Sequence, residues 1–76
     1  MREILKSRYG GSWDGESPEI HGLVEVGAKK FKVELLWVAA TEKWQCCVFE
    51  AGECVAIESG DSEVEVVARS LAAAMK

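Results

Sequence analysis

Three cysteines and one histidine are the side chains of this 76-residue chain that are best suited to nucleophilic or metal chemistry. Cys46 and Cys47 are adjacent, and adjacent strand residues point to opposite faces, so their thiols cannot simply chelate one ion together. With Cys54 the cysteines are odd in number, which does not match a framework of paired disulfides. A structural zinc site takes about four ligands, and His21 is the only histidine. We therefore expect buried free thiols, no metal and no cofactor.

The remaining residues do not assemble a recognisable catalytic motif. A nucleophile needs a positioned base beside it, and no turn-strand-helix nucleophile motif accompanies His21, which we interpret as an exposed strand residue. Glu50 and Glu53 fall at a predicted hairpin tip, where no pocket would raise the pKa of a carboxyl group. No glycine-rich segment joins a strand to a helix to hold phosphate. The sequence predicts a protein without enzymatic activity.

The composition predicts one folded domain over residues 1–76. Apolar residues make up 49% and charged residues 29% of the chain, as in ordinary globular proteins. The formal net charge of -4 disfavours binding to nucleic-acid phosphates. No apolar run approaches the about 20 residues that span a membrane, and the first six residues lack the apolar stretch of a signal peptide. We expect a cytoplasmic protein, in the host cytoplasm if it is viral.

Residues 1–18 are expected to form an N-terminal segment and loop, followed by a compact body over residues 19–76. Residues 2–9 fit a short helix or an edge strand, and helix is preferred because Gly10 and Gly11 give a natural stop. Residues 10–18 are dense in turn formers, which predicts a loop. Trp13 within this loop either folds back onto the domain, the favoured alternative, or contacts a partner.

The body predicts an α+β fold: a four-stranded antiparallel meander with one C-terminal helix packed on one face. The predicted strands are residues 20–26, 30–39, 44–50 and 53–58, separated by hairpin-length turns. Taking each turn as an even-length loop collects the apolar residues on one face of the sheet. This face is expected to carry Ile20, Val24, Val26, Phe31, Val33, Leu35, Trp37, Trp44, Cys46, Val48, Val55 and Ile57.

The C-terminal segment predicts a helix that covers this apolar face. Ser62 is suited to cap its start, with Glu65 three residues later. An exposed ion pair is expected between Glu65 and Arg69, four residues apart. The expected buried stripe is Val64, Val67, Ala68, Leu71, Ala72, Ala74 and Met75, with Glu63, Glu65, Arg69 and Ser70 opposite.

The second face of the sheet carries an unexpected apolar patch. Alternation breaks at Leu36 and Val38, which are apolar where polar residues are due. Glu25 is expected opposite Lys32. The patch is predicted to centre on Leu36, Val38, Cys47 and Phe49, with Glu25, Lys32 and Glu34 around it.

Three occupants could cover this patch: the first 13 residues, a second copy of the chain, or another protein. Of these, we predict that another protein binds there, because an apolar centre with a charged rim has the anatomy of an interface. The predicted interaction residues are Trp13, Leu23, Glu25, Lys32, Glu34, Leu36, Val38, Cys47 and Phe49.

The layout resembles two known groups of proteins. A short N-terminal segment, a meander and a helix entered through Gly60-Asp61-Ser62 are similar to the double-stranded-RNA-binding fold. Where that family has a basic cluster, this chain carries Asp61, Glu63 and Glu65, which disfavours RNA binding by that route. The alternative functions are a double-stranded-RNA-binding-like domain, or a homodimeric structural domain without nucleic-acid binding.

The chain also resembles small phage-encoded inhibitors of host defence, the anti-CRISPR proteins. Several of these are short, acidic, single-domain chains with a small antiparallel sheet and an alanine-rich helix, which the C-terminal segment 60–76 resembles. This resemblance implies a protein that occupies a surface of a CRISPR effector complex and performs no chemistry of its own.

Overall fold

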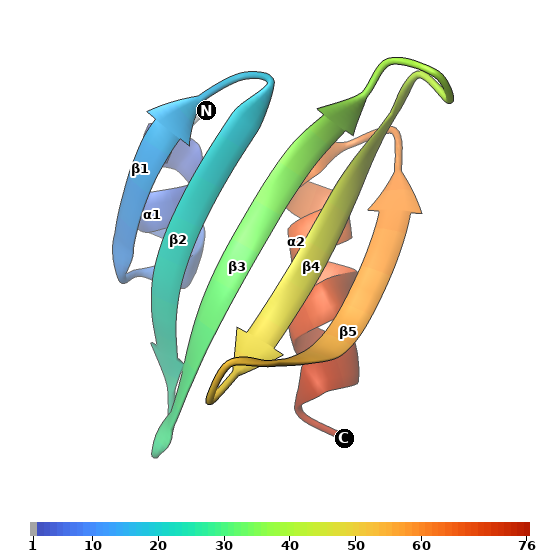
Figure 1. Cartoon of the computed structure of the whole chain (residues 1–76). Coiled ribbons are helices and arrows are strands. Elements are labelled where there is room, and N and C mark those ends of the chain that lie inside the picture. Colours follow the sequence, from blue (N-terminus) through green and yellow to red (C-terminus); the bar gives the residue numbers. More distant parts are fainter. Residues whose placement is uncertain (1) are drawn as a thin grey trace.

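A computed structural model describes residues 2–76 as an α+β fold with one five-stranded antiparallel sheet and two helices (Figure 1). Met1, part of the N-terminal segment considered above, lies outside the described residues. The strands lie in chain order, β1-β2-β3-β4-β5, so β3 is central. The elements are α1 (Arg2–Tyr9), β1 (Ser12–Glu16), β2 (Glu19–Val26), β3 (Lys29–Val38), β4 (Lys43–Glu50), β5 (Glu53–Gly60) and α2 (Glu63–Ala74).

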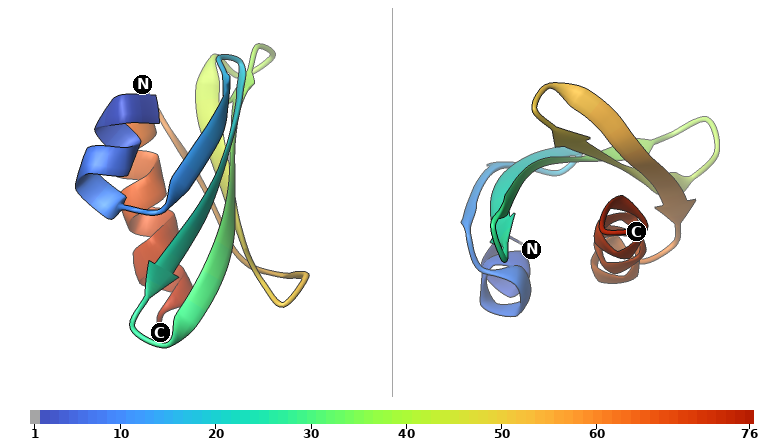
Figure 2. Two further views of the ribbon diagram at one scale, coloured as in Figure 1. Left: turned by 90° about the vertical axis from the view of Figure 1, so that its left-hand side faces the viewer. Right: turned by 90° about the horizontal axis from the view of Figure 1, so that it is seen from below.

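Both helices lie on the same side of the curved sheet (Figure 2). α1 packs beneath β1, and α2 packs beneath β4 and β5. The Tyr9 hydroxyl at the end of α1 donates a hydrogen bond of 2.8 Å to the Val64 carbonyl of α2 and so connects the two helices. Residues 2–13 therefore do not cover the second face of the sheet, which excludes this segment as the occupant of the apolar patch.

The core lies between the two helices and this covered face of the sheet. The expected faces of β2, β3 and β4 are confirmed, because Ile20, Phe31 and Cys46 are almost completely buried here. The helix α1 over Arg2–Tyr9 confirms the preference for a helix in this segment. Its Leu5 is fully buried in the core, whereas the neighbouring Ile4 is 51% exposed. The buried apolar residues are Leu5, Ile20, Val24, Phe31, Val33, Leu35, Trp44, Cys46, Val48, Val66, Val67, Leu71 and Ala74.

β1 replaces most of the predicted loop, so the prediction of four strands was wrong by one. Trp13 folds back, as favoured, and its ring lies against Gly22 of β2 while its indole N–H donates to the Gly10 carbonyl at 2.8 Å. At Gly15, φ is +85°, and an added Cβ would lie 2.6 Å from the Glu19 carbonyl oxygen. Glycine thus allows the close approach of β1 to β2, and the composition that predicted a loop permits a strand instead.

The two faces of β5 were predicted incorrectly. The two-residue turn at Ala51-Gly52 is as expected and pairs Glu50 with Glu53, but a β-bulge follows it. Phe49 pairs with Cys54, whereas Val48 pairs with Ala56, which leaves Val55 as the extra residue. One inserted residue reverses the faces of all later residues, so Ala56 lies on the helix-covered face and Ile57 lies on the opposite one.

α2 begins as predicted but is rotated relative to the expected stripe. The Ser62 hydroxyl accepts a bond from the Glu65 amide at 3.4 Å, which confirms the cap. Ser70, expected to be exposed, is fully buried, and its hydroxyl donates to the Val66 carbonyl at 2.8 Å. Arg69 donates to the Ser59 carbonyl at 2.7 Å, in place of the expected pairing with Glu65. The buried residues are Val66, Val67, Ser70, Leu71 and Ala74, while Ala68, Ala72 and Met75 are exposed.

We predict that Gly22→Ala destabilises the protein by about 1–3 kcal/mol, because the new methyl group overpacks the site occupied by the Trp13 ring. An ideal Cβ at Gly22 would lie 2.5 Å from Cε3 of Trp13. Thermal unfolding followed by circular dichroism measures the change. In a Trp13→Ala background the same substitution should have little effect, and an equal loss in both backgrounds would contradict this account of β1.

Candidate functional site

The candidate site is the sheet face opposite the helices, called here the open face. Three rows of paired residues across β2–β5 define its centre. In chain order of the strands, the Lys32 row is Leu23, Lys32, Phe49 and Cys54; the Glu34 row is His21, Glu34, Cys47 and Ile57; and the Leu36 row is Glu19, Leu36, Gln45 and Ser59. Among residues 2–76, no helix lies over these rows (Figure 2).

Apolar side chains are exposed on the open face. Leu23 is 62% exposed and Ile57 is 56% exposed, whereas Leu36, Cys47 and Phe49 are partly buried by their neighbours. Strands β2, β3 and β4 each bury residues in the core, and β5 packs its partly buried Ala56 against it, so the sheet holds this face in place. Together these side chains form a preformed apolar surface.

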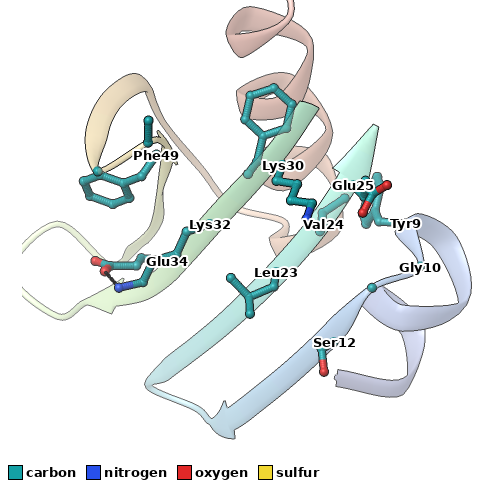
Figure 3. Close-up of a pocket in the computed structure, with 14 residues that line it drawn as sticks. Tyr9, Gly10, Ser12, Leu23, Val24, Glu25, Lys30, Lys32, Glu34 and Phe49 are labelled. Carbon is teal, nitrogen blue, oxygen red and sulfur yellow. Dashed lines mark ion pairs between the residues drawn. The ribbon is translucent and has the colours of Figure 1, made fainter. Parts of the chain in front are cut away.

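The centre of the open face is an ion pair rather than an apolar island. Lys32 and Glu34 are consecutive on this face of β3, and their charged atoms lie 3.4 Å apart. Leu23 and Phe49 flank Lys32 on the neighbouring strands, as Figure 3 shows. The expected arrangement of an apolar centre within a charged rim was therefore wrong: the charged pair lies at the centre, with apolar residues on both sides.

The cross-strand partner of Glu25 also differs from the expected one. The turn between β2 and β3 consists of two residues, Gly27 and Ala28, and it pairs Val26 with Lys29. Glu25 consequently lies opposite Lys30, while Lys32 lies opposite Leu23. Glu25 therefore still faces a lysine across the strands, which is favourable, but this lysine is Lys30, which lies nearer the β2–β3 turn than Lys32.

The predicted interaction residues lie together with one exception. Leu23, Glu25, Lys32, Glu34, Leu36, Val38, Cys47 and Phe49 all belong to the open face. Trp13 pairs with Gly22, a residue of the helix-covered face, and packs against the core. Trp13 thus stabilises β1 from the other side of the sheet and does not join the candidate surface.

Ile57 belongs to the open face but was missed by the sequence reasoning. Its side chain lies beside Cys47 and is 56% exposed, compared with 39% for Val55 on the same strand. Only the bulge at Val55 places it there, and uninterrupted alternation from the turn predicted the other face. The sequence signal that points to it is the run Cys54-Val55-Ala56-Ile57, which is too continuously apolar for simple alternation.

A shallow groove of about 760 Å³ lies at the end of the open face nearest the β2–β3 turn (Figure 3). Leu23 and Phe49 form its apolar walls, and Lys30, Lys32 and Glu34 contribute charged groups. The groove continues to the segment Tyr9–Ser12 beside β1. It therefore extends the apolar surface toward the first strand.

The three thiols are free and occupy different environments, so the expectation of three buried thiols was only partly correct. Cys46 is fully buried, Cys47 is partly buried and Cys54 is exposed. Burial raises the pKa of the Cys46 thiol to about 11, against a hydrogen bond with Ser70 that lowers it. Burial also raises the pKa of Cys47, and the nearby Cys54 and Glu34 add to this effect.

Residues 2–76 contain no cluster of three or more histidine, cysteine, aspartate or glutamate side chains that could hold a metal ion. His21 lies 2.7 Å from the Glu19 carboxylate on the exposed surface. None of the helices in this part of the chain is long and apolar enough to cross a membrane.

We predict that alkylation of the folded protein at pH 8 modifies Cys54 first, Cys47 more slowly and Cys46 only after denaturation. The thiolate is the reactive form, and both burial and a raised pKa lower its population at Cys46. Tandem mass spectrometry of iodoacetamide-treated protein distinguishes the adjacent Cys46 and Cys47. Equal rates at Cys46 and Cys54 in the folded protein would contradict the burial of Cys46.

Comparison with known proteins does not assign the chain to a family: no protein-family model, no curated protein and no solved structure matches it.

Proposed function

We propose that this protein binds another protein through the open face of its sheet and performs no chemical reaction of its own. One observation carries this proposal: Leu23 and Ile57 expose 62% and 56% of their surface on a rigid sheet face that no described helix covers. Exposed apolar side chains that gather on one face are typical of protein interfaces. The helix-covered side, by contrast, buries most of its apolar side chains in the core.

The side chains of the open face define the chemistry of the partner. Leu23 and Phe49 on one side of β3, and Cys47 and Ile57 on the other, require apolar contacts from a partner surface. Lys32 and Glu34 lie between them, so the partner must present an acid near Lys32 and a base near Glu34. Burying this ion pair without such groups would be unfavourable, and the pair therefore supplies specificity.

RNA binding, the alternative, has less support. Phosphate binding at the start of α2 would require basic residues there, but this region carries Asp61, Glu63 and Glu65. The positive groups of the open face are also paired with acids, since Lys32 contacts Glu34 and Lys30 lies opposite Glu25.

The proposal predicts that Leu23→Thr and Ile57→Thr each weaken partner binding by about tenfold or more without unfolding the protein. Both side chains are exposed, and threonine retains the preference for a strand while removing apolar contact area. The partner is first captured from the native host with the wild-type protein, and its affinity for each variant is then measured with purified components.

Ile4→Gln provides the matched control, because Ile4 is also apolar and is 51% exposed, but it lies on α1 at the other side of the sheet. This variant should bind like the wild type. Equal loss of affinity in Ile4→Gln, or unchanged affinity in both strand variants, would place the binding surface elsewhere.

The specific partner implied by the resemblance to anti-CRISPR proteins is a CRISPR effector complex. We predict that expression of the wild-type chain raises the plating efficiency of a phage that the host CRISPR system targets. The double variant Leu23→Thr/Ile57→Thr should lose this effect, while Ile4→Gln should retain it. Unchanged plating with the wild-type chain would contradict inhibition of that complex and leave the binding of another protein to be identified by capture.

A further inference from the structure

We infer that a second copy of this chain covers the open face in the absence of a partner, in a two-fold arrangement that places Lys32 of each copy opposite Glu34 of the other. This inference rests on the proposed function because both concern the open face of the sheet. It adds a regulation of that surface: the second copy must leave before a partner can bind, and self-association therefore lowers the apparent affinity for the partner.

The charges at the centre of the open face are self-complementary. β3 is the central strand, and of its charged residues on this face, which also include Lys30, the base Lys32 and the acid Glu34 occupy the two successive positions on either side of Val33. A two-fold axis that runs across the strands at the level of Val33 exchanges these two positions. Each copy then brings its lysine over the glutamate of the other, which forms two reciprocal ion pairs and satisfies the only fully charged groups of the Lys32 and Glu34 rows.

The same axis brings apolar or uncharged side chains together on the other strands. It exchanges the Lys32 row with the Glu34 row, so Phe49 of one copy meets Cys47 of the other, and Cys54 meets Ile57. On β2 it places Leu23 over the ring of His21. The exposed Leu23 and Ile57 side chains are thereby removed from water, and no like charges of these two rows face each other.

The size of the face suits a dimer at the lower limit of stable interfaces. Five strands about 4.8 Å apart and on average about 27 Å long offer about 600 Å² per copy. Because the open face is the convex side of the curved sheet (Figure 2), face-to-face packing would cover at most about 1,200 Å² in total, the lower end of the range for specific interfaces. A dimer of this size can dissociate to admit a partner, as the proposed regulation requires.

Outside the two central rows, the same axis places Glu19 of one copy over Glu25 of the other on β2, and this like-charge contact opposes the packing that the central ion pairs favour. Lys32 and Glu34 cancel within the two central rows. Asp61, Glu63 and Glu65 contribute to the acidic excess around the start of α2, on the helix side of the sheet. At physiological ionic strength, charges separated by more than about 8 Å are largely screened.

Charge reversal at the two central positions tests the inference. Sedimentation over a range of concentrations should show a concentration-dependent dimer for the wild type. Lys32→Glu and Glu34→Lys should each raise the dimer dissociation constant by about 100-fold, because each creates two like-charge contacts across the axis. An equimolar mixture of the two variants should form a mixed dimer, and the double variant Lys32→Glu/Glu34→Lys should dimerise like the wild type.

Circular dichroism confirms that each variant is folded before its association is measured. A wild-type chain that stays monomeric at all concentrations would overturn the inference, and so would single variants that dimerise as tightly as the wild type. Failure of this inference is distinguishable from failure of the proposed function. A monomer whose partner binding still depends on Leu23 and Ile57 overturns self-association alone, whereas a dimer that binds no partner supports self-association and opposes the proposed function.

Discussion

Leu5 of α1 and Val66 of α2 are fully buried against the same side of one sheet, and this shared core determines the rest of the molecule. A chain of 76 residues is small and builds a single core, which here lies between the helices and one face of the sheet. Because both helices join that layer, and Tyr9 connects them through the Val64 carbonyl, no helix of residues 2–76 covers the opposite face. The open face is thus a consequence of how the core is built.

The two edges of the sheet are less suited to association than its open face. β1 is only five residues long, and its one glycine, Gly15, provides no side chain to bury. β5 is bulged at Val55, and it places Glu58 on the helix-covered side, opposite Cys46. Short strands, bulges and inward-facing charges all discourage the pairing of an edge strand with another chain. Association through the face, where rigid side chains rather than free backbone groups are presented, agrees better with this construction.

Much of the fold could be predicted, and the errors have identifiable physical causes. The faces of β2, β3 and β4 follow from alternation, since one buried side of a sheet leaves a strong period of two. β1 was missed because Gly15 and the preceding Gly10 and Gly11 are typical of loops, while the contact of Trp13 with Gly22 joins residues of different segments. The rotation of α2 was missed because alanine is tolerated on either side of a helix and a buried serine can bond to its own turn.

The candidate surface shows the same division between local and tertiary information. The sequence alone determined that the second face has apolar residues, because Leu36, Val38, Cys47 and Phe49 follow directly from the strand period. Only the tertiary structure decided what surrounds them: the two-residue turn sets Leu23 opposite Lys32, and the bulge brings Ile57 beside Cys47. It also decided that α1 lies on the other side, because helix placement depends on the summed burial of residues distant in the chain, which no local period records.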